Sequence, residues 1–196
     1  MTRADRRPRR RLDVEQRRAA ILAAAQDAFG AAAYQQVALS RVAEAAGASE
    51  ALVLRYYGSK ATLYVEVVRS AIALLLQRQR AADAALPAGT APLDRVAASA
   101  RTYLGFVAEF RHGWAGPLRT PWGEPPEAEA LRVELRTHYV DLLRALLGPG
   151  PDHAFRGYLG FLDAACLAWV EAGCPDDERE PLVAAAVGAL RGALTD

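Results

Sequence analysis

The spacing of apolar residues along the chain is that of helices. Between Asp13 and Gly30, Val14, Ile21, Ala25 and Phe29 recur close to the period of one helix face. Asp13 is expected to cap this helix, because Gln16 stands three residues later in the position of a capping box. No stretch alternates apolar and polar residues as a strand would. The sequence therefore predicts an all-α fold of about nine helices.

Helical patterns separated by Pro and Gly continue to the end of the chain. They cover residues 60–84, 92–111, 124–147, 152–172 and 178–194, with a broken Pro/Gly segment at 113–126. The larger C-terminal part is therefore expected to be a helical bundle.

Two short helices with abrupt ends precede residue 60. The segments "RVAEAA" and "EALVLRYY" are each followed by glycine, at Gly47 and Gly58. Ser40, Ser49 and Ser59 are expected to cap these helices and the one that begins at Lys60. Two short helices joined through a glycine are typical of a helix-turn-helix, whose second helix enters the major groove of DNA. Any compact helical protein can contain such a pair, so the pattern alone leaves DNA binding open.

The distribution of charge favours DNA binding. The chain has 23 Arg and a single Lys, with net charge +5 over residues 1–60 and −4 over residues 61–196. Residues 1–12 are predicted to be a disordered basic arm. A basic head on an acidic body is typical of a protein whose head meets nucleic acid.

The short helices supply the side chains that this interaction needs. Helix N-termini and fixed cations bind phosphates, and the first turn of "SEALVL" is placed to read base edges. Val53 and Tyr57 are expected to pack inward. The predicted DNA contacts are Ser40, Arg41, Ser49, Glu50, Ala51, Leu52, Arg55, Tyr56 and Lys60.

Residues 21–64, "ILAAAQDAFGAAAYQQVALSRVAEAAGASEALVLRYYGSKATLY", resemble the DNA-binding domain of the TetR (tetracycline repressor) family of bacterial regulators. The shared pattern is an "I-x-x-A-A-x-x-x-F" helix, an "A-x-x-A-G-V-S" turn, an aromatic pair and "G-S-K". The resemblance implies a three-helix DNA-binding domain at 13–59 and a ligand-binding and dimerisation domain at 60–196. It also implies a homodimer that binds a near-palindromic operator, and a small molecule that releases the DNA.

By the same resemblance, Ser49, Glu50 and Ala51 fall where the family reads bases. Phosphates would be held by Ser40, Arg41, Arg55, Tyr56 and Lys60. The chain departs from the family pattern at two positions. Leu54 stands where the family often has Tyr, which removes one phenol from the phosphate contacts, and Ala33 replaces the Gly before Tyr34.

Aromatic residues concentrate between residues 100 and 172. Aromatic side chains at helical spacing are most often core, but together they also predict an apolar pocket with a few polar groups. The candidate pocket residues are Tyr103, Phe106, Phe110, Trp114, Arg119, Trp122, His138, Tyr139 and Trp169.

Small residues form stripes on the last two helices. Glycine inside a helix costs about 1 kcal/mol relative to alanine, so close approach of another helix is the expected reason. A dimer interface of two helices from each subunit is predicted, with tight packing inside the monomer as the alternative. The candidate interface residues are Gly157, Gly160, Ala164, Ala168, Ala184 and Gly188.

The cysteines, the histidines and the length of the apolar runs favour some classes of protein over others. Cys166 and Cys174 lack metal-ligand spacing and are predicted to be reduced thiols of a cytoplasmic protein, and no apolar run is long enough to span a membrane. The histidines lack metal-like spacing, and no nucleophile–base pair is visible, so neither a metal, a cofactor nor an enzyme is predicted. The alternatives are a helical small-molecule-binding or enzymatic protein with a vestigial head, and an architectural DNA binder without a ligand.

Overall fold

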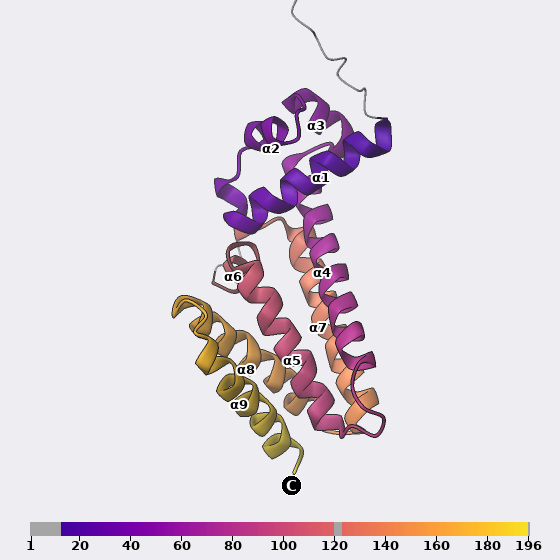
Figure 1. Cartoon of the computed structure of the whole chain (residues 1–196), viewed down its shortest axis with the longest axis vertical. Coiled ribbons are helices and arrows are strands. Elements are labelled where there is room, and N and C mark those ends of the chain that lie inside the picture. Colours follow the sequence, from indigo (N-terminus) through magenta and orange to yellow (C-terminus); the bar gives the residue numbers. More distant parts are fainter. Residues whose placement is uncertain (1–12, 120–122, 196) are drawn as a thin grey trace, which may run out of the picture.

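The computed structural model describes residues 13–119 and 123–195, and over these residues the chain forms nine α-helices and one 3-10 helix (Figure 1). The predicted all-α fold is confirmed, whereas the predicted basic arm at 1–12 lies outside the described residues. The elements are α1 (Val14–Ala31), η1 (Tyr34–Gln36), α2 (Leu39–Ala45), α3 (Glu50–Tyr57), α4 (Lys60–Ala84), α5 (Pro92–Glu109), α6 (Arg111–Arg119), α7 (Pro126–Leu147), α8 (Asp152–Glu171) and α9 (Asp176–Leu194).

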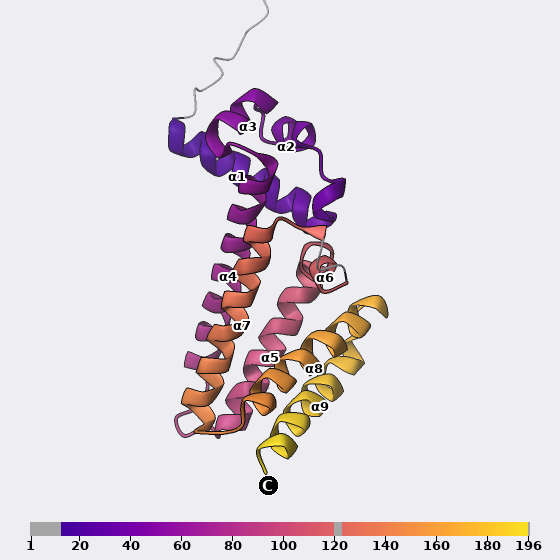
Figure 2. The same ribbon diagram turned by 180° about the vertical axis from the view of Figure 1, so that it is seen from behind.

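The helices form a small head and a longer body. Helices α1, α2 and α3 gather at one end, and α4 leaves them to run along the body beside α5 and α7 (Figure 1). Seen from behind, α5 lies between α7 and the pair α8–α9 (Figure 2). Helix α4 therefore connects the head to the body as one continuous element.

The helix ends follow the predicted chemistry at most positions. Asp13 and Gln16 form the capping box of α1, Ser49 Oγ accepts from the Leu52 N–H, and Ser59 Oγ accepts from the Thr62 N–H. Gly47 and Gly58 have φ of 60° and 78°, the left-handed region that favours glycine. These caps and turns explain why one helix ends and the next begins at two places within twenty residues.

Three local predictions were wrong. Ser40 does not cap α2, because the helix already begins at Leu39 and its N-cap, Ala38, offers no side-chain hydrogen bond. Val14 is 62% exposed, because no described element covers the first turn of α1. The prediction of a broken segment at 113–126 is wrong in its first half, which is helical up to Arg119 with Pro117 inside the last turns of α6, whereas residues 123–125 are not α-helical and α7 begins at Pro126.

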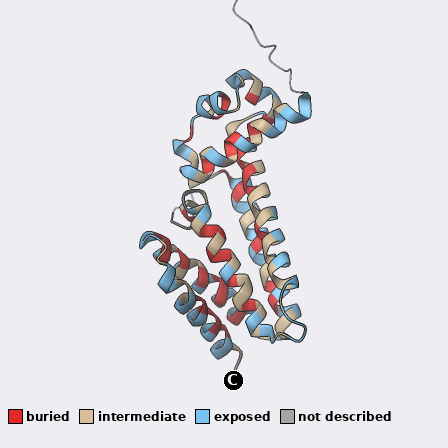
Figure 3. Ribbon diagram, in the orientation of Figure 1, coloured by how far each residue is buried: buried red, intermediate tan, exposed pale blue. Residues whose placement is uncertain are grey.

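Buried side chains form two cores (Figure 3). The head core is built around Ile21, Phe29, Val42 and Val53, each at most 1% exposed, and burying a side chain of this size contributes about 1.5–3 kcal/mol. The first turns of α4, with Leu63, Tyr64, Val67 and Val68, belong to this head core, whereas Leu75 belongs to the body core. Movement of α4 therefore moves packed residues in both parts.

The described residues settle three smaller points. Cys166 and Cys174 are free cysteines, the first buried and the second half-buried. No group of three or more candidate metal ligands occurs among the described residues. Of the described helices, none combines the length and apolar character needed to cross a membrane.

Candidate functional site

Helix α3 has one buried and one exposed face. Val53 and Tyr57 are 1% and 5% exposed and join the head core. The face turned to solvent carries Glu50, Ala51 and Arg55. A helix held by one side and open on the other is what insertion into a major groove requires.

The remaining predicted DNA contacts differ in exposure. Ser40, Arg41 and Ser49 are exposed, and Leu52 and Tyr56 are half-buried. Leu54 is 39% exposed, so the apolar side chain that departs from the family pattern lies on the outer surface of α3. Ala33 has φ −62° and ψ 150°, an ordinary extended conformation, so the turn before Tyr34 does not require glycine.

Two arginines of α1 hold the helix-turn-helix in place. Arg17 Nη1 donates to the Gly47 carbonyl at 3.1 Å, which fixes the turn between α2 and α3. The Tyr57 hydroxyl donates to the Arg18 carbonyl at 2.9 Å, and the Arg18 guanidinium lies 5.5 Å from the Tyr57 ring centroid. These contacts set the orientation of α3 on α1.

The single lysine lies against an aromatic ring. Lys60 Nζ is 4.5 Å from the Tyr34 ring centroid, and burial lowers the pKa of Lys60. Tyr34 in turn contacts Tyr64 and Phe29, with ring centroids 4.8 Å and 6.0 Å away. The ammonium group therefore has a defined position at the first residue of α4, where the helix dipole also attracts an anion.

A buried ionic cluster joins the head to the body. The Glu124 side chain is 3% exposed and accepts from Arg132 Nε and from the Tyr64 hydroxyl, both at 2.8 Å. Arg132 also lies over Trp114, 4.8 Å from the ring centroid. The sequence analysis missed this cluster, because Tyr64 is 60 residues from Glu124 and the sequence does not show that the two side chains meet.

Helix α6 packs against α1 at the same junction. A Cβ placed on Gly113 would lie 2.4 Å from the Phe29 carbonyl oxygen, so only glycine permits this approach. The junction is therefore held by one close backbone contact and one buried ion pair.

The body contains a cavity of about 540 Å³ lined by α4, α5, α7 and α8, together with Trp114 of α6. Of the predicted pocket residues, Tyr103, Trp114, His138 and Tyr139 line it. About half of the other lining is aliphatic, with the side chains Leu76, Val96, Ala100, Leu135, Leu142, Leu143, Ala145, Leu146, Leu159 and Leu162. Its size and lining are those of a site for a drug-sized molecule.

Hydrogen bonds organise the polar groups of the cavity. The Tyr103 hydroxyl donates to Asp163 at 3.1 Å and accepts from Trp114 Nε1 at 3.3 Å, while Asp163 pairs with Arg136 at 2.6 Å. The Tyr139 hydroxyl donates to Gln79 Oε1 at 2.6 Å. Burial is the main cause that raises the pKa of both Tyr103 and Tyr139, so both hydroxyls stay protonated. Gln79 and Asp163 were missed by the sequence analysis, which looked for aromatic residues.

Other predicted pocket residues do not line this cavity. Phe106 is in the body core with its ring 5.1 Å from Trp114, and Phe110 lines a second hollow between α1, α4 and α6. The Trp169 indole donates to the Pro175 carbonyl at 2.8 Å and closes the turn before α9. Trp122 and the Arg119 side chain lie outside the described residues.

The small-residue stripe lies on the outer surface of α8 and α9. The predicted interface residues are all exposed: Gly157, Gly160, Ala164, Ala168, Ala184 and Gly188. A Cβ added at the three glycines would meet nothing within 4 Å. Phe161, 40% exposed, lies on the same helix. The alternative explanation, tight packing of these residues against another helix of the same monomer, is therefore wrong.

Comparisons with known proteins agree with the geometry of the head. Residues 21–67 match the family model of bacterial regulatory proteins of the tetR family. A tetR-family transcriptional regulator from Streptomyces coelicolor superposes with a TM-score of 0.73 at 24% identity, covering 92% of this chain and 80% of that one. A comparison with curated protein sequences gave no match.

Two further solved structures share the fold. NalD from Pseudomonas aeruginosa, the secondary repressor of the MexAB-OprM multidrug efflux pump, has a TM-score of 0.67 at 20% identity, covering 94% of this chain and all of that one. The regulator FadR from Bacillus subtilis, in complex with stearoyl-CoA, has a TM-score of 0.65 at 17% identity, covering 90% and 97%. Residues 21–67 are therefore similar in sequence to the tetR family of bacterial regulatory proteins, and the described chain has the fold of the tetR-family regulators that it resembles.

Proposed function

We propose that the protein is a homodimeric repressor that binds a near-palindromic operator and is released when a small molecule enters the body cavity. The observation that carries this proposal is the exposed face of α3, which is held on α1 by Val53, Tyr57 and the Arg17 contact. Ser49, Glu50 and Ala51 would read bases, with Leu52 half-buried beside them. Ser40, Arg41, Arg55, Tyr56 and Lys60 would hold phosphates. NalD and FadR, with the same fold, are regulators by their names, and FadR is seen with an acyl-CoA.

The second half of the proposal is the dimer. The exposed stripe of small residues on α8 and α9, together with Phe161, would pack against its copy in a partner subunit. Two heads of one dimer would then meet successive major grooves, about 34–36 Å apart. Lys60 and Arg55 from both protomers would double the phosphate contacts.

The cavity is proposed to act on the head through α4 and the junction. Trp114 and Arg132 line the cavity, Arg132 binds Glu124, and Glu124 binds Tyr64 of α4, whose ring contacts Tyr34 of the head core. A ligand that binds one dimer geometry more tightly than the other, by about 1–3 kcal/mol, would shift the spacing of the heads. The cavity supports this proposal over that of an architectural DNA binder without a ligand.

A selection from random duplex DNA tests the proposal. The full-length protein should enrich an inverted repeat, and native mass measurement of the complex should give two protomers on each enriched duplex. Lack of enrichment after repeated rounds would contradict sequence-specific binding and support the alternative of a small-molecule-binding protein with a vestigial head. Enrichment of a single half-site would contradict the dimer.

A further inference from the structure

One polar group of the cavity wall is the phenol of Tyr158. Tyr158 lines the cavity and is 6% exposed, yet no described residue forms a hydrogen bond with its hydroxyl. The hydroxyl is not among the fully buried polar atoms that lack a partner, so it is open to the cavity and can bond there to water or to a ligand. Tyr139 lines the same cavity. Because Tyr139 already donates to Gln79, the Tyr158 hydroxyl is the one that is available to a ligand.

Apart from the exposed Arg80, the described charged side chains that line the cavity are paired. Arg95 binds Asp83 through two contacts of 2.7 Å and 2.5 Å, on α5 and α4. Arg136 on α7 binds Asp163 on α8, and Arg132 binds the buried Glu124.

An ionic ligand would have to break one of these pairs. An anionic ligand that formed an ion pair with Arg136 would remove the partner of Asp163, whose side chain is 25% exposed. The Asp163 carboxylate would then keep only its hydrogen bond from the Tyr103 hydroxyl. Removing one partner from this partly exposed pair costs free energy, and the only unpaired cation of the cavity lining among the described residues, Arg80, is exposed to solvent. Arg80 and His138 are exposed to solvent, so they stay hydrated outside the interior.

The shape of the cavity is set by the helices that line it. Along α7 the lining extends from Arg132 to Leu146, which corresponds to about 21 Å of helix. The aliphatic side chains follow this length, with Leu135 towards the head end and Leu146 at the far end. A compact polar molecule would leave most of this apolar surface uncovered.

We propose that the effector is an uncharged, elongated and mainly apolar molecule with one oxygen that hydrogen-bonds to the Tyr158 hydroxyl. This inference rests on the proposed function, in which the cavity holds the effector, but it is tested on the protein without DNA. Three probes with the same ten-carbon chain separate the head-group chemistries at neutral pH: decan-1-ol, which is neutral, decanoate and decylammonium. Their binding is followed by the change in tryptophan fluorescence, because Trp114 lines the cavity.

The expected result is that decan-1-ol binds at least tenfold more tightly than either ion. Tyr158→Phe should weaken decan-1-ol about tenfold while leaving the affinity for both ions and the melting temperature unchanged, because the hydroxyl has no partner to lose. Tyr139→Phe is the matched control, since it also removes one phenol oxygen but from a hydroxyl already bonded to Gln79. It should change the decan-1-ol affinity much less.

Three results would overturn the inference. Tighter or equal binding of decanoate or decylammonium would show that the cavity accepts a charge. Unchanged affinity of Tyr158→Phe for decan-1-ol would remove the role of that hydroxyl. Failure of all three probes would show that the cavity does not take an elongated apolar ligand. Each of these leaves DNA binding as a separate measurement, so failure here is distinguishable from failure of the proposed regulator function.

Discussion

Replacing Glu124 with glutamine is expected to lower the free energy of unfolding by about 3 kcal/mol. The Glu124 and Arg132 side chains are 3% and 19% exposed, so the substitution leaves a guanidinium largely removed from water without its counter-charge. Breaking a buried pair from one side costs roughly 3–5 kcal/mol. The lower end applies, because glutamine keeps the shape and a carbonyl that can still accept from the Tyr64 hydroxyl.

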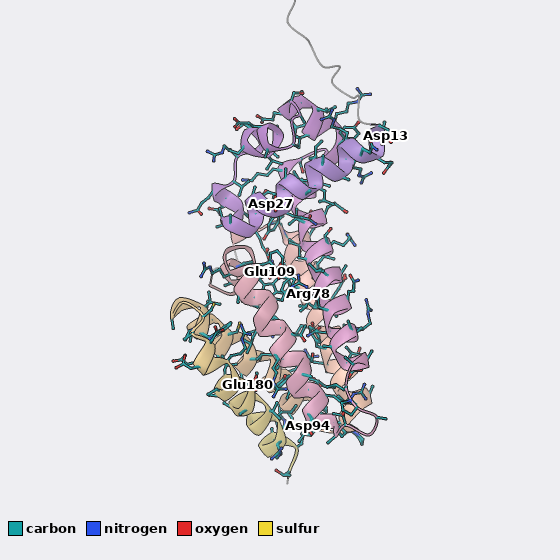
Figure 4. All side chains as sticks on the ribbon, in the orientation of Figure 1. Asp13, Asp27, Arg78, Asp94, Glu109 and Glu180 are labelled. Carbon is teal, nitrogen blue, oxygen red and sulfur yellow. The ribbon has the colours of Figure 1, made fainter. Side chains whose placement is uncertain are left out.

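The prediction is measured by urea unfolding and by the melting temperature at one fixed protein concentration. For a chain of this size, 3 kcal/mol corresponds to a decrease of about 6–12 °C in Tm. Glu109→Gln is the matched control, because Glu109 pairs with Arg78 on the outer surface, where the side chains are 49% and 37% exposed (Figure 4). That variant should lose less than about 1 kcal/mol. Equal losses in the two variants, or a loss below about 1 kcal/mol in Glu124→Gln, would refute the reasoning that this pair holds the junction.

Three further predictions concern the body. In the native protein at pH 8, Ellman's reagent should react quickly with Cys174 only, because Cys166 is buried and burial raises the pKa of its thiol to about 12. In denaturant both cysteines should react. Fast reaction of two thiols in the native protein would contradict this prediction. Hydrogen bonding to Arg95 lowers the pKa of Asp83 in the folded state, so the stabilisation is present above about pH 4 and lost as pH falls below it. Asp83→Asn should therefore lower Tm at pH 7 and have little effect at pH 2.5, and an equal effect at both would contradict the ion pair. Gly160→Arg should give a monomer in analytical ultracentrifugation, whereas Ala73→Arg, at an exposed site on α4, should leave the dimer; a dimeric Gly160→Arg would move the interface elsewhere.

The sequence was most informative where local chemistry determines the structure. The caps at Asp13, Ser49 and Ser59 and the turns at Gly47 and Gly58 depend on residues within a few positions of each other, and all five were predicted. Ser40 was misread because a serine one residue inside a helix has the same local pattern as a cap.

The cavity and the junction could be predicted only in part, because they depend on packing between distant helices. Tyr103 and Trp114 were assigned to a pocket on their aromatic character alone, and the same criterion selected Phe106 and Trp169, which the structure buries elsewhere. Glu124 is one of many acidic residues in the sequence, and acidic residues are usually exposed. Its burial depends on contacts with Tyr64 and Arg132, which are 60 and 8 residues away in sequence.

The central claim is that the head binds DNA through α3 and the cations beside it. The most direct measurement is fluorescence anisotropy of the selected duplex and of a scrambled duplex, across a salt series, with wild type, Arg55→Ala, Lys60→Ala and the body control Arg80→Ala. The account predicts preference for the selected duplex and affinity that falls steeply with salt. The slope should be smaller by about two for Arg55→Ala and for Lys60→Ala, one contact per protomer, and unchanged for Arg80→Ala. Equal binding to both duplexes, or slopes that the two head substitutions do not change, would contradict the account.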